Sequence, residues 1–363
     1  MLNNSLSDRL FISPYLFLLI RDGKLIIWDF KKHEQYELEP AYLERLLEIS
    51  SGLQNEINDI DKNLLEAELL SPHAIKVDWE WDVLSQIFHF GTSITTDVCI
   101  NETLTPENFI SEYLVFCEEN YKDNTTINEL NETEGIILPP PDLSILSSVD
   151  FLTILKNRKT CRSFIKNKIS LLTLSTLLYT VFGDFHSSVE NYKKYGYEKI
   201  GMRKTSPSGG GLHPTEAYLV VKDVGDLAEG IYYYSPTLHS LHWINNADML
   251  TNPGTLFCGQ YFSENISFGI FMTSRFDKIW GKYQHSRAYR IALFDVGHLS
   301  QTFQLVATAL GLNTWLSGAF SDQKVNTLLG IADTPEQALF FVGAGIAEVS
   351  DSPFDRITNA KNY

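Results

Sequence analysis

The residues best suited to chemistry begin with a glycine run flanked by polar side chains. Residues 203–218 read Arg-Lys-Thr-Ser-Pro-Ser-Gly-Gly-Gly-Leu-His-Pro-Thr-Glu-Ala-Tyr. Consecutive glycines allow a backbone to approach a flat ligand closely and to turn its amides toward that ligand. The run is not a P-loop, because no Gly-Lys-Ser/Thr follows it, and it lacks the GxGxxG pattern of dinucleotide-binding folds. By glycine content alone, a flexible surface loop is the simpler interpretation.

A charged stretch upstream is a second candidate for ligand binding. Residues 158–164 read Arg-Lys-Thr-Cys-Arg-Ser-Phe. Cations of different reach beside a hydroxyl group suit a dianionic phosphate. In isolation, the same run is more typical of a solvated charged turn.

The neighbouring Lys282 and Tyr283 are a third candidate, here for proton transfer. Burial beside an apolar substrate lowers the pKa of a lysine toward neutrality, and a tyrosine can relay or share the proton. A Lys-Tyr pair taken alone usually belongs to a solvent-exposed loop. The sequence has no HExxH motif, no paired carboxylates and no Cys/His ligand cluster, so we expect no catalytic metal.

The composition argues against several classes of protein. A formal charge of -16 disfavours a nucleic-acid partner, because phosphate backbones are bound by basic surfaces. Residues 1–8 lack the basic and apolar stretches of a signal peptide, and the apolar run at residues 16–20 is too short to span a bilayer. The cysteines are scattered without a CxxC pair, as is typical of reduced thiols: Cys99, Cys117, Cys161 and Cys258. We therefore expect a cytoplasmic protein without a membrane segment.

The N-terminal segment has the pattern of a hairpin followed by helices. Apolar runs at residues 16–20 and 25–30 are joined through Asp22-Gly23, a strong hairpin signal because glycine accepts a positive φ. Helices with one apolar face are expected at residues 40–49 and 57–70.

This layout predicts a winged-helix-like domain over residues 1–78. It weakly resembles peptide-leader-recognising domains, which bind a peptide as an added strand; a structural cap is the alternative. A helix at residues 79–91 comes next, and consecutive prolines at residues 139–141 mark an extended linker. We therefore assign residues 79–150 to a helical excursion and a Pro-rich linker that lead into a catalytic domain.

The last segment, residues 151–363, has a mixed pattern. Helices are expected at residues 152–157, 171–182 and 287–310. Strands are expected at residues 217–221, 231–234, 241–244, 268–273 and 339–342. The longest helix is apolar on most sides, which predicts a buried central helix that ends at Gly311. Because strands and helices do not alternate regularly, the predicted fold class is α+β, not a doubly wound sheet.

Four ordered motifs between residues 80 and 345 resemble a known family. Residues 206–216 resemble the signature of the SagB-type dehydrogenases, the azoline oxidases within the FMN-dependent nitroreductase superfamily. Residues 158–164 resemble the opening Arg-Arg-Ser-x-Arg-x-Phe of nitroreductases. The two remaining motifs are the Lys-Tyr loop with the central helix, at residues 280–283, 287–290 and 295–299, and the turn at residues 311–318. The resemblance implies a nitroreductase-like fold, with a mixed or antiparallel sheet and a long buried central helix.

The resemblance also implies FMN at the interface of a homodimer. The residues implied at the FMN phosphate and ribityl chain are Arg158, Lys159, Thr160 and Arg162. Those implied along the isoalloxazine edge are Pro207, Ser208, Gly209 and Gly210, and those implied near the ring are Leu316, Ser317 and Gly318. General nitroreductases carry an asparagine where this chain has Gly211, which separates it from the nitroaromatic-reducing group. We further expect Glu216 to accept hydrogen bonds from nearby backbone amides.

The implied activity is the oxidation of thiazoline or oxazoline rings to thiazole or oxazole in a ribosomally made precursor peptide, beside a partner cyclodehydratase. A proton leaves the α-carbon and a hydride leaves the adjacent ring carbon for the flavin, so Lys282 and Tyr283 are implied as the catalytic pair. Two alternatives stay open. One is flavin-dependent reduction of dehydroalanine in a lanthipeptide-like precursor, and the other is a non-catalytic scaffold that presents the peptide.

Overall fold

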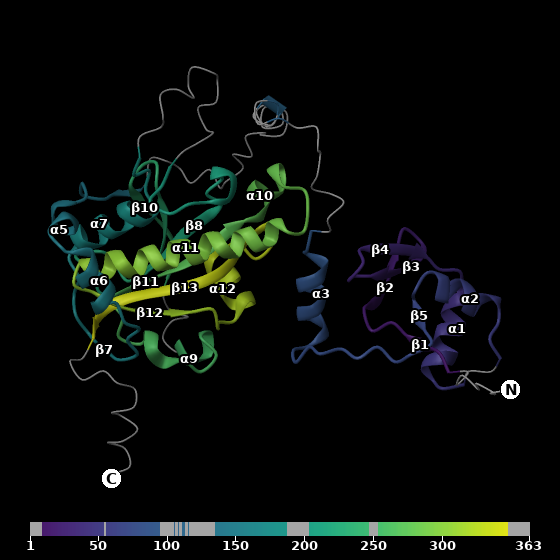
Figure 1. Cartoon of the computed structure of the whole chain (residues 1–363). Coiled ribbons are helices and arrows are strands. Elements are labelled where there is room, and N and C mark those ends of the chain that lie inside the picture. The colour runs from purple at the N-terminus through teal and green to yellow at the C-terminus, as the bar shows by residue number, and fades with distance from the viewer. Residues whose placement is uncertain are drawn as a thin grey trace, which may run out of the picture. The chain divides into compact units, whose positions relative to one another are not determined.

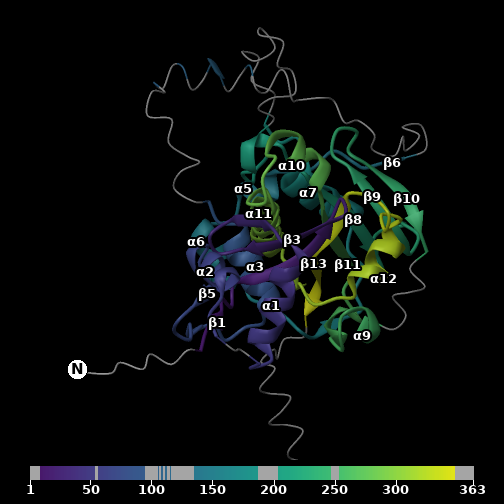
Figure 2. The ribbon, with the colours of Figure 1, turned by 90° about the vertical axis from the view of Figure 1, so that its right-hand side faces the viewer.

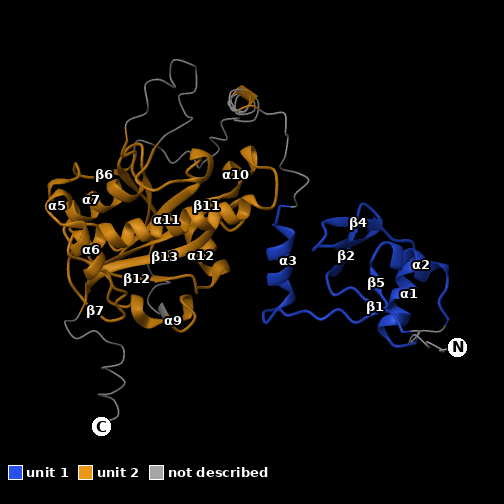
Figure 3. Cartoon of the chain, in the orientation of Figure 1, with its two compact units in different colours: residues 1–102 blue, residues 103–363 orange. Residues whose placement is uncertain are grey.

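The structure is a computed structural model that describes residues 9–53, 56–94, 105, 108, 111–112, 115, 135–186, 203–246 and 253–347. Its contacts divide the chain into two compact units, residues 1–102 and 103–363, which Figure 3 shows in separate colours. The boundaries inferred from sequence, at residues 78 and 150, stay a prediction. Cys99, Cys117 and most of the expected excursion lie outside the described residues.

The first unit contains a three-stranded antiparallel sheet in the order β2-β3-β4 (Figure 1). Its strands are β2 (Leu16–Arg21), β3 (Lys24–Asp29) and β4 (Glu34–Glu37). Asp22 and Gly23 have φ angles of 52° and 75°, and two positive angles are what a two-residue type I′ turn requires. The structure thus contains the predicted hairpin. The sequence pattern misses β4, because Glu-Gln-Tyr-Glu has no run of apolar residues.

The helices of the first unit are α1 (Pro40–Ser50), α2 (Asp59–Glu66) and α3 (Val83–Gly91). The helix predicted at residues 57–70 is too long, because the chain leaves the helical conformation after Glu66. Glu68 has a positive φ of 54°. The chain then enters the short strand β5 (Leu70–Ser71), which pairs with β1 (Phe11–Ile12).

Helix α3 packs within the first unit. A ring nitrogen of His33 lies 2.8 Å from the carbonyl oxygen of Phe90, and the Phe90 ring lies 6.5 Å from that of Phe30. The helix predicted at residues 79–91 begins later than expected, after Asp82, whose side chain caps its N-terminus.

The second unit is built on one large antiparallel sheet in the order β12-β13-β11-β8-β9-β10-β6, with β7 paired to β13. Its strands are β6 (Ile136–Ile137), β7 (Phe164–Ile165), β8 (Thr215–Val221), β9 (Gly230–Ser235), β10 (Ser240–Asn245), β11 (Phe268–Arg275), β12 (Asn313–Ser317) and β13 (Glu336–Ala347). The α+β class with an antiparallel sheet is therefore confirmed.

Helices cover both faces of this sheet (Figure 2). They are α5 (Ser144–Ser147), α6 (Phe151–Asn157), α7 (Leu171–Phe182), α9 (Pro253–Leu256), α10 (Phe276–Lys282), α11 (Ala288–Ala309) and α12 (Asp322–Leu329). Side chains of β8 alternate between the two faces, as the pleat requires. Leu219 packs into a core with α7 and α11, whereas Tyr218 and Val220 pack into a second core with α12.

The predicted long central helix is confirmed as α11. Its sheet-facing side is buried through Val296, Leu299 and Phe303. Its opposite side leaves Leu293 and Phe294 exposed by 40% and 55%. The helix is therefore buried on one side and carries an apolar strip on the other. None of the helices in the described ranges combines the length and hydropathy needed to cross a bilayer.

Candidate functional site

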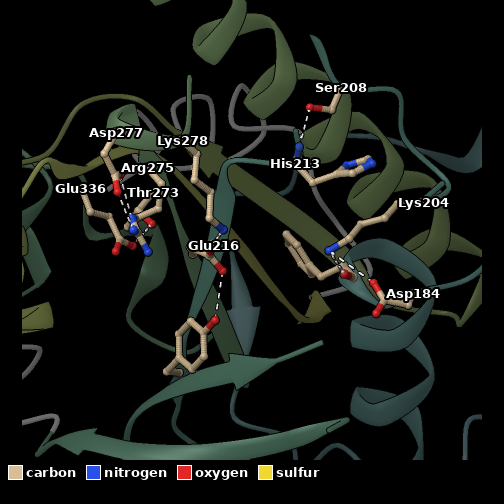
Figure 4. Close-up of polar contacts among 12 residues, drawn as sticks. Asp184, Lys204, Ser208, His213, Glu216, Thr273, Arg275, Asp277, Lys278 and Glu336 are labelled. Atoms are coloured by element: carbon tan, nitrogen blue, oxygen red, sulfur yellow. Dashed lines mark hydrogen bonds and ion pairs between the residues drawn. The ribbon is translucent and has the colours of Figure 1, made fainter. Parts of the chain in front are cut away.

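The segment before the glycine run is fixed to two helices. Lys204 and Thr205 donate hydrogen bonds of 2.7 and 2.6 Å to carbonyl oxygens in the last turn of α7. Ser206 shares a hydrogen bond of 2.6 Å with Thr302 of α11. Burial lowers the pKa of Lys204, although the nearby Asp184 opposes the shift (Figure 4). The glycine run therefore starts from a rigid support, and the interpretation as a flexible surface loop does not describe it.

Asp295 of α11 holds the glycine run itself. One carboxylate oxygen accepts the Ser208 hydroxyl at 2.5 Å, and the other accepts the Gly209 amide at 3.0 Å. The Ser208 oxygen in turn accepts the amide of His213 at 3.0 Å (Figure 4). Burial raises the pKa of Asp295, and the bonds from Ser208 and Gly209 partly oppose that shift. The motif strings contain Asp295, but its role as the anchor of this loop is visible only in the structure.

The glycine run and the Lys-Tyr pair lie in direct contact. The Lys282 ammonium donates a hydrogen bond of 2.9 Å to the carbonyl oxygen of Gly210. A Cβ atom on Gly210 would lie 2.4 Å from the Tyr283 hydroxyl and 2.7 Å from the Lys282 nitrogen. Gly210 also has a positive φ of 63°. Only glycine fits this position without displacing the pair.

Helix α10, which ends at Lys282, is tied to the sheet by charged side chains. Lys278 donates to one oxygen of Glu216 at 2.6 Å, and the Tyr233 hydroxyl donates to the other at 3.0 Å (Figure 4). At the start of the helix, Arg275 forms an ion pair with Asp277. The two hydrogen bonds found for Glu216 come from side chains, and not from the backbone amides that we expected.

The predicted phosphate-binding residues lie at the other end of α11, along β12. The Arg158 guanidinium donates to Gln304 of α11 at 3.1 Å. Thr160 forms an isolated bridge with Thr314 of β12. The Arg162 guanidinium lies over the Phe262 ring, 5.7 Å from its centroid. The Lys159 side chain is exposed, so two cations of this stretch, Lys159 and Arg162, face solvent.

The turn at residues 316–318 begins at the end of β12, the strand that the charged stretch contacts through Thr160. Leu316 is half-buried and Gly318 is exposed. The Ser317 hydroxyl donates to Gln260 at 3.2 Å and accepts the Ala319 amide at 3.0 Å. Ser317 thus holds the shape of its own turn.

The candidate residues therefore form two groups that lie beside different parts of α11. The first group contains residues 158–162 and 316–318, and the second contains residues 207–210 with Lys282 and Tyr283. Their anchors on α11, Gln304 and Asp295, are nine residues apart, which corresponds to about 14 Å along a helix. In the second group Lys282 contacts Gly210 directly, and in the first group Thr160 pairs with Thr314, two residues before Leu316. Among the described residues, no cluster of three or more His, Cys, Asp or Glu side chains could hold a metal ion.

Comparisons with known proteins agree with this architecture. The nitroreductase family model matches residues 155–346, just over half of the 363-residue chain. A putative nitroreductase of Methanocaldococcus jannaschii is 28% identical over 195 residues, which cover 54% of this chain and 90% of that protein. The chain therefore belongs to the nitroreductase family, and its nitroreductase-like fold is confirmed.

Two further relatives are named as processing proteins of trifolitoxin and of microcin B17. The trifolitoxin-processing protein of Rhizobium leguminosarum bv. trifolii is 30% identical over 142 residues, covering 38% of each chain. The microcin B17-processing protein of Escherichia coli is 27% identical over 167 residues, covering 44% of this chain and 56% of that protein. The chain thus spans about half or less of these two relatives.

Among solved structures, the chain is also similar to the Escherichia coli microcin synthetase complex with truncated pro-MccB17 bound. The sequence identity is 22% and the TM-score 0.44, and the match covers 69% of this chain and 96% of that one.

Proposed function

We propose that the chain is an FMN-dependent oxidoreductase of the SagB-type branch, which oxidises thiazoline or oxazoline rings to thiazole or oxazole in a ribosomally made precursor peptide. The observation that carries this proposal is the contact of Lys282 and Tyr283 with Gly210. A potential base lies against a side-chain-free stretch of backbone, which a flat ring system can approach. The names of the peptide-processing relatives support the substrate class.

The side chains of both groups fit the chemistry of FMN, which nitroreductases typically use. The cations Lys159 and Arg162 are exposed and can pair with a phosphate dianion. The hydroxyl groups of Thr314 and Thr215 are buried and have no hydrogen-bond partner among the described residues. Buried polar groups are nearly always satisfied, so each hydroxyl needs a partner, which a bound ligand or a water molecule would supply. Thr314 lies beside Thr160, and Thr215 lines a small cleft with Pro207 and Ser208.

The protein residues supply binding and proton transfer in this proposal. Arg158, Lys159, Thr160 and Arg162 hold the phosphate and the ribityl chain. Pro207, Ser208, Gly209 and Gly210 would line the ring edge of a bound FMN, and Leu316, Ser317 and Gly318 would pack near the ring. FMN bound there would accept a hydride from the azoline ring, and dioxygen would take up the two electrons. As a neutral amine, Lys282, assisted by Tyr283, accepts the proton from the α-carbon, and its hydrogen bond to the Gly210 carbonyl fixes where that proton is received.

A homodimer, a cyclodehydratase and the precursor peptide are the proposed partners. Exposed apolar side chains also occur on α6, which contacts α11: Phe151, Leu152 and Leu155 of α6 are exposed by 62%, 55% and 46%. Exposed apolar side chains on two adjacent helices are typical of a protein interface. A second copy on this face would bring further residues to the two groups along α11. The winged-helix-like first unit either recognises the leader peptide or docks the cyclodehydratase, in a cytoplasmic setting.

The proposal is tested by incubating the purified protein with two peptides, one that carries azoline rings and one that carries dehydroalanine. We expect the azoline peptide to lose two hydrogens by mass spectrometry and the dehydroalanine peptide to stay unchanged. Lys282→Met should retain bound flavin and lower the rate at least about a hundredfold, the usual contribution of a general base. Lys278→Arg, which keeps the charge one turn away, is the matched control. A gain of two hydrogens on dehydroalanine would reverse the proposed direction, and flavin-free protein would favour the scaffold.

A further inference from the structure

We infer that Glu216 is a positioning residue that sets the place of Lys282 by holding α10 through Lys278. The inference rests on the proposed function for its significance, because Lys282 is the proposed base. Its structural content is independent of flavin and substrate: a carboxylate on the strand after the glycine run fixes the register of the helix that carries the base.

Helix α10 depends on such contacts. It has seven residues, fewer than an isolated helix needs to be stable in water. Its apolar packing on α11 comes from Ile279 and from Phe276, whose ring stacks on that of Tyr289 at 4.9 Å. This packing holds the start and the middle of the helix. Directional contacts toward its C-terminal end then fix where the base lies.

Two lysines one helical turn apart supply those contacts. Lys278 binds Glu216 at 2.6 Å, and Lys282 binds the Gly210 carbonyl at 2.9 Å. Glu216 and Gly210 belong to one continuous segment, the glycine run and the start of β8. The four-residue spacing of the lysines corresponds to about 6 Å along the helix axis. The glycine run and the start of β8 therefore bind α10 at two points, one helical turn apart.

Glu216 is itself held firmly. Its side chain is buried, with 8% of the residue exposed, and its second oxygen accepts the Tyr233 hydroxyl at 3.0 Å. Tyr233 lies on β9, the strand next to β8. The carboxylate is thus fixed from the sheet side and can fix the helix in turn. If the Lys278 contact is lost, α10 can shift and the Lys282 ammonium leaves the Gly210 carbonyl.

The test is competitive acetylation of the full chain with acetic anhydride, with the rate at each lysine read by mass spectrometry. The variants are Glu216→Gln, Lys278→Met and the double variant, which leaves no unpaired buried charge. We expect acetylation of Lys282 to rise at least about fivefold in all three, because an exposed amine reacts faster than one held in a buried contact. The acetylation rate of Lys282 in the double variant should not exceed the rate in the single variants, because all three variants break the same Lys278–Glu216 ion pair.

Three comparisons make the outcome decisive. Lys278→Arg keeps the ion pair and should leave Lys282 acetylation at the wild-type rate. Lys222, half-buried in the same unit and bonded to the carbonyl oxygens of Ser263 and Glu264, should also stay at its wild-type rate. An unchanged rate at Lys282 in the double variant would overturn the inference, and so would an equal rise at Lys282 and Lys222, which indicates general loosening. A selective rise in protein that binds no flavin would uphold the inference and refute the proposed function.

Discussion

At the scale of single residues, Gly210 gives a sharp test of the contact between the glycine run and the Lys-Tyr pair. Gly210→Ala forces a Cβ atom to within 2.4 Å of the Tyr283 hydroxyl, so we expect the pair to be displaced and turnover to be lost. Gly211→Ala is the matched control. Gly211 has a similar φ of 68°, but a Cβ atom there meets nothing within 4 Å. Both variants carry the backbone strain of about 1–2 kcal/mol, and only the first carries the clash.

The measurement is the melting temperature together with the rate on the azoline peptide. Similar losses of stability in both variants, with turnover lost only in Gly210→Ala, would support the site. Equal turnover in the two variants would mean that the close packing around Gly210 has no catalytic role.

At the scale of elements, the contact of Asp295 in α11 with the glycine run is expected to affect stability and FMN binding in opposite ways. Burial raises the pKa of Asp295 above its ordinary value of 3.8, so the ionised carboxylate disfavours the folded state. Stability should therefore fall as the pH rises through the window between 3.8 and the raised pKa. Asp295→Asn removes this dependence, and we expect it to unfold at the same or a higher temperature at neutral pH.

The same variant should bind FMN more weakly. An asparagine keeps only one oxygen, which can accept the Gly209 amide, and its NH2 group cannot accept the Ser208 hydroxyl. The Ser208 hydroxyl thus loses its carboxylate acceptor, and we expect affinity to fall about tenfold. Asp226→Asn, at an exposed turn of the same unit, is the control. Weaker folding with unchanged FMN affinity would show that Asp295 serves stability only.

Elements with strong local patterns could be predicted from the sequence. The helix at Leu171–Phe182 has the predicted bounds, because Ser170 caps its start and its apolar spacing is regular. The Asp22-Gly23 hairpin follows from turn chemistry alone. Two of the errors in the first unit have another cause: β4 is stabilised by pairing with β3, and β5 by pairing with β1. Partners distant in sequence leave no local pattern, so propensity cannot find these strands.

In the candidate site, too, local motifs could be predicted from the sequence and contacts between distant segments could not. The motif strings located the glycine run and the Lys-Tyr pair, and the structure brings these two together. Glu216 with Lys278, and Asp295 with Ser208, were not predicted as pairs. Each pair joins segments more than sixty residues apart in the chain, and one sequence carries no information on which distant charges meet.

At the scale of the whole molecule, the exposed apolar side chains of α6 and α11 predict self-association. Phe294→Asp places a charge among the exposed apolar side chains of this face, and we expect it to convert a dimer to monomers by light scattering. Burying one such ring contributes about 1.5–3 kcal/mol, enough to shift a dimer equilibrium by tenfold or more in each subunit. Leu238→Asp, at an exposed hairpin residue of the same unit, should leave the mass unchanged. A wild-type protein that is monomeric at micromolar concentration would contradict the prediction.

The central claim is that the two groups along α11 jointly hold one flavin mononucleotide. The most direct measurement is the identity and amount of flavin released from purified protein by heat, after incubation with excess FMN and removal of free ligand. We expect FMN at one molecule per chain in the wild type and in Lys156→Ala, an exposed neighbour, and at least tenfold weaker retention in Arg158→Ala. Protein that neither contains nor takes up FMN, or full occupancy in Arg158→Ala, would contradict it.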